Sequence, residues 1–191
     1  MVRKELGEVW TRLHQPDKAV EVWREHLDTL RAATPADGLR LTNTLIEYGR
    51  ALLKYDRAKD AEPLLRECLS IRAKALVNRE LWFPNTKETR RVLGECLTRR
   101  GADPSLALGA RIEKLREAEA LLLELANTML NDDTSYENRK TEAIQRVVDL
   151  YEAWHAADPD KGHDVKGEQW RARLPAKEEE QADEAGRSAG D

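Results

Sequence analysis

The chain has 191 residues, of which 36% are charged and only 5% are aromatic, and its formal net charge is −4. A chain of this length can bury the core of one domain, and a composition rich in charge and poor in rings is typical of long exposed helices. Residues 176–191 carry six acids and two bases, which leaves 30 acids and 30 bases in residues 1–175. A neutral body excludes a large phosphate-binding surface, so we expect no nucleic acid among the partners.

The apolar runs are too short to span a membrane, and the N-terminus lacks the apolar core of a signal peptide. We therefore expect no membrane partner and a cytoplasmic location. The two cysteines, Cys68 and Cys96, form no CxxC motif and no metal-ligand pattern with a nearby histidine, which favours buried and inert thiols.

Helix and turn signals divide residues 1–175 into four helix pairs. Pro16 begins a helix after a turn at Gln15, and Pro35 and Gly38 separate the first pair from the second. The predicted pairs span about 2–33, 39–77, 86–131 and 136–174, with helices at 2–14, 16–33, 39–55, 57–77, 86–100, 111–131, 136–157 and 165–174. The predicted fold class is all-α. Residues 176–191 are acidic and small, with nothing to bury, so we predict a disordered tail there.

The pairs repeat one pattern. Gly7 and Trp23 of the first pair correspond to Gly49 and Leu65 of the second at an offset of 42 residues, and the third pair repeats the glycine at Gly94. A fixed period in this range indicates stacked helix pairs. Glycine inside a helix costs about 1 kcal/mol against alanine, so its recurrence predicts a close approach of the second helix. The small residues expected to face these glycines on the second helices are Ala19, Ala61 and Ala118.

Large residues are predicted to fill the space between repeats. On the first helices these are Trp10, Leu52, Leu97 and Trp154. On the second helices they are Trp23, Leu65, Leu122 and Trp170.

The repeat is interrupted in the third pair. Ala61 and Ala118 are 57 residues apart, and most of the extra residues lie around 101–110, between the two helices of that pair. A uniform stack has no need of them, so we predict an insertion there. The sequence assigns it no role.

The spacing from Gly49 to Ala61, with Leu52 and Leu65 after them, resembles the tetratricopeptide repeat, and residues 61–76 are similar to its 42-residue, kinesin-light-chain-type form. This resemblance implies a right-handed α-solenoid of about four repeats, whose first helices line a concave groove for a peptide or partner helix.

A second resemblance covers roughly residues 40–175. The motifs at 81–86, 93–94, 119–123, 148–154 and 169–174 occur in an order similar to the C-terminal repeat arrays of large bacterial serine/threonine protein kinases. The Gly-rich loop, His-Arg-Asp and Asp-Phe-Gly of a kinase are missing, so no kinase activity follows. We expect either an arm of a longer protein of this kind or a free-standing repeat protein.

The groove positions that the tetratricopeptide resemblance implies define the candidate site. Arg12, Lys54 and Arg99 share one repeat position and are expected to form a basic line for an acidic or C-terminal peptide. An alternative is a solvated helix face with local pairs such as Glu95–Arg99. The candidate groove residues in full are Arg12, Asn43, Glu47, Arg50, Lys54, Arg91, Glu95 and Arg99.

Two further readings remain open. Exposed apolar residues at one end of the array, such as Val2, Leu6 and Val9, suggest self-association as an alternative function. His155, His163 and three aspartates between residues 158 and 164 cluster as a metal site would, but a polar turn between helices explains them better. We expect no catalytic residue, no metal and no cofactor.

Overall fold

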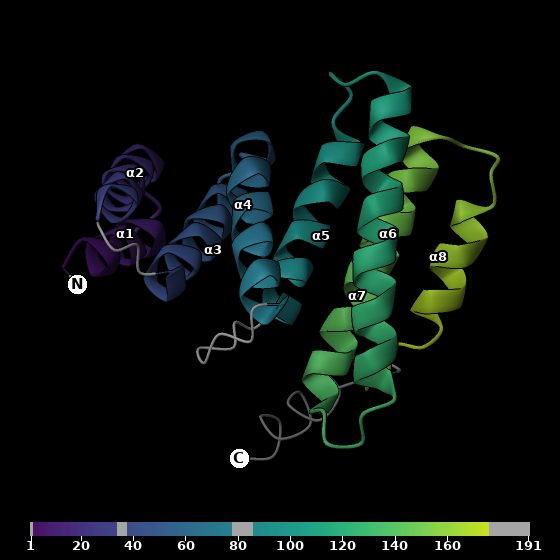
Figure 1. The fold of residues 1–191 in the computed structure, drawn as a ribbon. Helices are drawn as coiled ribbons and strands as arrows, with labels where there is room; N and C mark the ends of the chain where they lie inside the picture. Colours follow the sequence, from purple (N-terminus) through teal and green to yellow (C-terminus); the bar gives the residue numbers. More distant parts are fainter. Residues whose placement is uncertain (1, 34–37, 78–85, 176–191) are drawn as a thin grey trace, which may run out of the picture.

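A computed structural model describes residues 2–33, 38–77 and 86–175, and these contain eight α-helices and no strand (Figure 1). The all-α prediction is confirmed for this part of the chain. Pro35, residues 81–85 of the kinase-like motif and the predicted acidic tail, 176–191, lie outside it. The helices are α1 (Val2–Arg12), α2 (Pro16–Ala32), α3 (Gly38–Lys54), α4 (Ala58–Val77), α5 (Thr86–Ala102), α6 (Leu108–Leu130), α7 (Glu137–Ala157) and α8 (His163–Arg171).

The helices pack in the order of the chain. Each one contacts the next, and α1, α3, α5 and α7 also contact one another in succession. Figure 1 shows them side by side from the N-terminus to α8. Among the described residues, no helix is both long enough and apolar enough to cross a membrane.

The predicted close approach at the glycines is present in the first three pairs. A Cβ added to Gly7 would lie 2.7 Å from the Trp23 ring, and one added to Gly49 would lie 2.7 Å from Leu65 Cδ2. At Gly94 the same construction meets Leu122 Cδ2 at 2.6 Å. The glycines therefore admit a large side chain from the second helix, and this contact sets the distance between the two helices of a pair.

The large residues expected between the repeats are buried with one exception. Trp154, Leu52 and Leu97 lie in the core, as do Trp23, Leu65 and Leu122 on the second helices. Trp10 is only half-buried, and the ammonium group of Lys18 lies 4.6 Å from the centre of its ring. Trp10 lies on α1, which has a helix pair on one side only in the described structure, and this explains its exposure.

Residues 101–110 do not form a separate insertion, because half of them belong to the two flanking helices and only 103–107 connect them. α5 continues to Ala102 and α6 already begins at Leu108, so both helices are longer than predicted. Gly101 is buried against Leu115, one heptad beyond the contact of Gly94 with Leu122. The extra residues therefore lengthen one helical hairpin and repeat its glycine contact a second time.

The fourth pair differs from the others at the contact that corresponds to Gly7 and Trp23. Trp170 is buried in the core, as predicted for a large second-helix residue, but the residue of α8 at the contact position is Gly167, whose added Cβ would lie 3.5 Å from Tyr151 Cβ. Tyr151 and Gly167 are 16 residues apart, as are Gly7 and Trp23. The fourth pair thus keeps a contact between a glycine and a large residue, but the large residue lies on the first helix, α7, and the glycine lies on the second helix, α8.

Candidate binding groove

Seven of the eight predicted groove residues line hollows in the described surface. A hollow of about 280 Å³ between α1 and α3 is lined by Arg12, Glu47, Arg50 and Lys54, among others. A second, of about 330 Å³ between α5 and α7, is lined by Glu95 and Arg99. Arg91 lines the third and largest, of about 510 Å³. The first helices therefore border recessed surface at the places where the repeat alignment puts the groove.

Asn43 is the exception and lies in none of these hollows. Its Oδ1 accepts a hydrogen bond of 2.8 Å from Arg72, whose guanidinium also donates to Thr89 Oγ1 at 3.0 Å. Arg72 is buried, so these bonds pair its two terminal nitrogen atoms inside the stack of α3, α4 and α5. Asn43 therefore has a structural contact that ties it to the core.

The groove charges pair with one another across three helices. Arg50 on α3 pairs with Glu47 at 3.0 Å and also with Glu88 on α5. On α5, Arg91 pairs with Glu88 at 2.5 Å and with Glu95 at 2.7 Å. Arg146 on α7 pairs with Glu95 and, at 3.0 Å, with Glu142. We call this set the ion-pair ladder: Glu47, Arg50, Glu88, Arg91, Glu95, Arg146 and Glu142.

The ion-pair ladder changes the meaning of the predicted cations. Arg50 and Arg91 are already engaged by carboxylates of the same surface, so they offer less net charge to a ligand than the sequence suggests. The repeat pattern did not indicate Arg146 as a groove residue, because the corresponding positions in the second and third repeats are the buried threonines Thr44 and Thr89. The sequence did contain one indication of its role, because an arginine stands there at a repeat position that is buried in the other repeats.

Two residues of the predicted basic line, Lys54 and Arg99, form contacts within the protein. Lys54 Nζ donates to the carbonyl of Thr11 at 3.3 Å, and Arg99 donates to the carbonyl of Leu53. Thr11 and Leu53 are 42 residues apart and so occupy one repeat position. Each cation thus binds the negative end of the preceding first helix, where the last carbonyl groups lack helical donors. The line links consecutive repeats.

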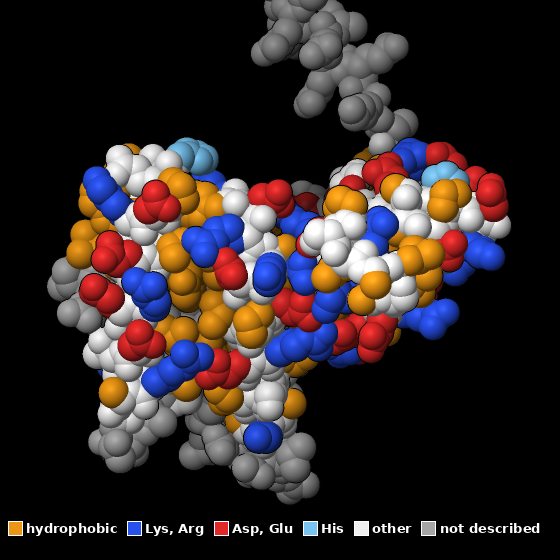
Figure 2. All heavy atoms as spheres, turned by 90° about the horizontal axis from the view of Figure 1, so that it is seen from above, with side chains coloured by type: hydrophobic (Ala, Val, Ile, Leu, Met, Phe, Trp, Pro, Cys, Tyr) orange, Lys and Arg blue, Asp and Glu red, His pale blue; other side chains and the backbone are white. Residues whose placement is uncertain are grey.

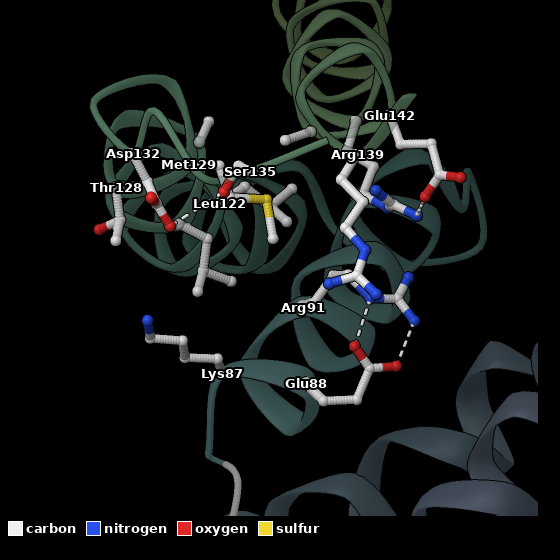
Figure 3. A pocket seen from close by; sticks show the side chains of 14 residues that line it. Lys87, Glu88, Arg91, Leu122, Thr128, Met129, Asp132, Ser135, Arg139 and Glu142 are labelled. Carbon is white, nitrogen blue, oxygen red and sulfur yellow. Dashed lines mark hydrogen bonds and ion pairs between the residues drawn. The ribbon is translucent and has the colours of Figure 1, made fainter. Parts of the chain in front are cut away.

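The largest hollow lies where the start of α5, the end of α6 and the start of α7 meet (Figure 3). Its apolar wall comes from α6, with Leu122, Leu125 and Met129. Its charged rim includes Asp132 together with Lys87 and Arg139, which are not among the groove positions that the repeat pattern predicts. The Asp132 carboxylate accepts hydrogen bonds from the side chain and backbone of Thr134 and from Ser135, which lower its pKa. An apolar wall beside fixed charges is the composition of a ligand site.

The surface has no large patch of one sign in the view of Figure 2, where basic and acidic side chains are interspersed with apolar ones. This agrees with the neutral count for residues 1–175. In this view no charged face marks a binding surface, so the candidate groove is defined by its hollows.

The histidine and aspartate cluster forms packing contacts. The ring of His163 is buried and stacks on Trp154 with centroids 4.3 Å apart, and His155 Nδ1 lies 3.9 Å from Asp164 Oδ1. Within residues 2–33, 38–77 and 86–175, no three His, Cys, Asp or Glu side chains are arranged to hold a metal ion.

Both cysteines are buried. Cys68 Sγ donates to the carbonyl of Thr42 and Cys96 Sγ donates to that of Ala58, each at 3.3 Å. Burial raises the pKa of both thiols, and that of Cys96 to about 12. Burial and the raised pKa both disfavour the thiolate, which is the nucleophilic form of cysteine.

Comparisons with family models, with curated proteins and with solved structures gave no match for this chain.

Proposed function

We propose that the chain is a non-catalytic protein–protein interaction scaffold, built as a right-handed α-solenoid of tetratricopeptide-like repeats. It binds a peptide or a partner helix in the concave groove that α1, α3, α5 and α7 line. The observation that carries the proposal is the largest hollow, which combines an apolar wall with a charged rim next to predicted groove residues. The repeated glycine contacts support the repeat assignment.

The motif order that is similar to bacterial kinase arrays supports a more specific setting. In this proposal the scaffold works in the cytoplasm beside a bacterial serine/threonine kinase, either as its C-terminal arm or as a separate chain. The ligand is a protein segment, because a groove shared by several helices offers a long contact surface to an extended or helical chain.

The ligand contributes apolar side chains as well as polar groups. The ion-pair ladder neutralises most groove charge internally, so electrostatic attraction alone gives little affinity. Leu125 and Met129 in the wall of the largest hollow supply contact area, and burial of apolar surface stabilises a complex by about 25 cal/mol per Å². Methionine also adapts its shape to different side chains.

A blocking substitution tests the proposal. A phage-displayed peptide library is selected against the immobilised chain, and the selected peptides are measured by fluorescence polarisation. Ser135 lines the largest hollow, so Ser135→Trp fills it and weakens binding about tenfold or more. Ser105→Trp is the matched control, because Ser105 also bonds an aspartate in a loop but lines none of the three hollows.

Selection of no specific peptide, or equal loss of affinity in both variants, contradicts the proposal. Circular dichroism and thermal melting of the two variants show whether a loss of binding reflects loss of fold.

A further inference from the structure

One apolar surface of the molecule has no role in the groove. Leu6, Val9 and Leu13 on and just after α1 are 41%, 40% and 57% exposed. They are three and four residues apart, so they share one side of a helix. We call them the α1 face. Contiguous exposed apolar side chains, unlike apolar residues scattered singly over a surface, mark interaction sites.

The same repeat positions are covered elsewhere in the molecule. Tyr48 and Leu93 correspond to Leu6 and are 8% and 1% exposed, while Ala51 and Cys96 correspond to Val9 and are 3% and 0% exposed. The cover is the second helix of the preceding pair, since α2 packs on α3 and α4 packs on α5. Cys96, for example, donates to a backbone carbonyl of α4. The α1 face thus has the chemistry of a surface that receives an apolar helix.

The opposite end of the array is different. Every exposed residue of α8 except Val165 is polar or charged, and Arg171 pairs with Glu168 and Glu152 there. A polar outer face on a terminal helix caps a stack of repeats. α8 is therefore a poor cover for the α1 face of another copy, and head-to-tail stacking of copies is disfavoured.

We propose that two copies of this chain associate through their α1 faces, with the two α1 helices antiparallel around a twofold axis near Val9. Glu5 and Arg12 are both exposed and flank the α1 face on one side, because they are seven residues apart. In the antiparallel arrangement Glu5 of each copy meets Arg12 of the other, which gives two ion pairs. A twofold contact of this kind closes on itself and does not form filaments.

The α1 faces are small for an interface. Three side chains from each copy bury well below the roughly 1,200 Å² of a stable, specific complex, so the dimer is weak and reversible. The flanking charges then determine the orientation and partner choice more than the affinity. This inference is tested separately from the groove proposal. Arg12 borders both surfaces, but Leu6, Val9 and Leu13 line none of the three hollows, and association is measured without a ligand.

Sedimentation equilibrium of the 191-residue chain over a range of concentrations tests the proposal. We expect a monomer–dimer equilibrium whose dissociation constant rises about tenfold or more in Leu13→Gln. Val165→Gln is the matched control, because Val165 is 56% exposed but lies on α8, and it leaves the equilibrium unchanged. A chain that stays monomeric, or a control that weakens association as much as Leu13→Gln, overturns the proposal.

Charge reversal tests the orientation. Glu5→Arg and Arg12→Glu each place like charges opposite one another, so each variant alone associates more weakly than the wild type. An equimolar mixture of the two restores opposite charges at both sites and associates more strongly than either variant alone. A mixture no stronger than the separate variants excludes the antiparallel pairing.

Discussion

Gly49 on α3 lies so close to Leu65 on α4 that a Cβ on the glycine would be 2.7 Å from Leu65 Cδ2 and 2.9 Å from Cγ. Leu65 is fully buried, so its side chain has no free space into which to turn. The same relationship between a first-helix glycine and a large second-helix residue occurs at Gly7 and Gly94. It is the local contact that the repeat preserves.

Substitution of that glycine therefore destabilises the fold even though alanine is the better helix former. We expect Gly49→Ala to lower the free energy of unfolding by about 1–2 kcal/mol, because overpacking outweighs a helix-propensity gain of about 1 kcal/mol. Gly109→Ala is the control: no heavy atom lies within 4 Å of its added Cβ, so we expect stability to be unchanged or slightly higher. Urea unfolding of both variants gives the comparison. A Gly49→Ala protein more stable than the wild type contradicts the contact.

Glu62 holds together three helices. It accepts hydrogen bonds from Lys114 on α6 and Arg66 on α4, and it pairs with Arg100 on α5. Burial alone raises the pKa of Glu62, but the hydrogen bonds and charges of Lys114 and Arg66 outweigh it, and the pKa is lowered. We expect Glu62→Ala to cost about 2–3 kcal/mol, because it leaves the buried Arg100 without this partner.

The matched control for Glu62 is Glu124, whose side chain is 57% exposed and pairs with Arg90. We expect Glu124→Ala to cost less than about 1 kcal/mol, as is usual for a solvated pair. Chemical denaturation of the two variants at neutral pH and moderate salt decides between them. Equal effects would mean that the Glu62 cluster contributes no more than a surface ion pair.

The stability of the fold is expected to depend on pH through His163. Burial, and next the positive charge of Lys166, lower the pKa of His163 below its usual 6.5, while Glu119 and Asp158 act in the opposite direction. The folded state thus favours the neutral ring, so the contribution to stability is complete above pH 6.5 and is lost as the pH falls through the lowered pKa. We expect His163→Phe, which retains a ring against Trp154, to remove this part of the pH dependence. Unfolding measured from pH 5 to 8 in both proteins is the test, and parallel curves would refute it.

The burial of the two cysteines leads to a prediction about their reactivity. Because Cys68 and Cys96 are fully buried and their pKa values are raised, we expect no reaction with a thiol reagent in the native protein. Both react at once in concentrated urea. Reaction of either thiol in the native protein at the rate of an exposed cysteine would show that its helix opens without global unfolding.

The sequence predicted the contacts that depend on repeat position. Gly94 and Leu122 were aligned with Gly49 and Leu65 by pattern alone, and the structure brings each pair together. Helix ends are within about three residues of the prediction, because Pro16 and the loop residues near Asp158 are strong local signals.

Contacts that depend on which residues of different helices meet could not be predicted from the repeat pattern. In the fourth pair the large residue, Tyr151, lies on the first helix and the glycine, Gly167, lies on the second, so a pattern that looks for a first-helix glycine does not find this contact. The ion-pair ladder depends on side chains from α3, α5 and α7, and a repeat pattern gives spacing along the chain rather than partners across helices. For the same reason Lys54 and Arg99 were predicted to contact a ligand, whereas they donate to the carbonyl groups of Thr11 and Leu53.

The long hairpin of α5 and α6 has a consequence for how the chain folds. α6 is 23 residues long, and its two glycine contacts with α5, at Gly94 and Gly101, close over a short connection. Gly101 and Leu115 are 14 residues apart, against 16 for the glycine contacts of the first two pairs, so this inner contact closes at the lowest cost in chain entropy. Once it is closed, Gly94 and Leu122 are already near one another, and the second contact adds to the same hairpin. The third pair is therefore the expected nucleus, from which order spreads toward both ends. In hydrogen exchange, amide protection should be greatest in α5 and α6 and least in α1.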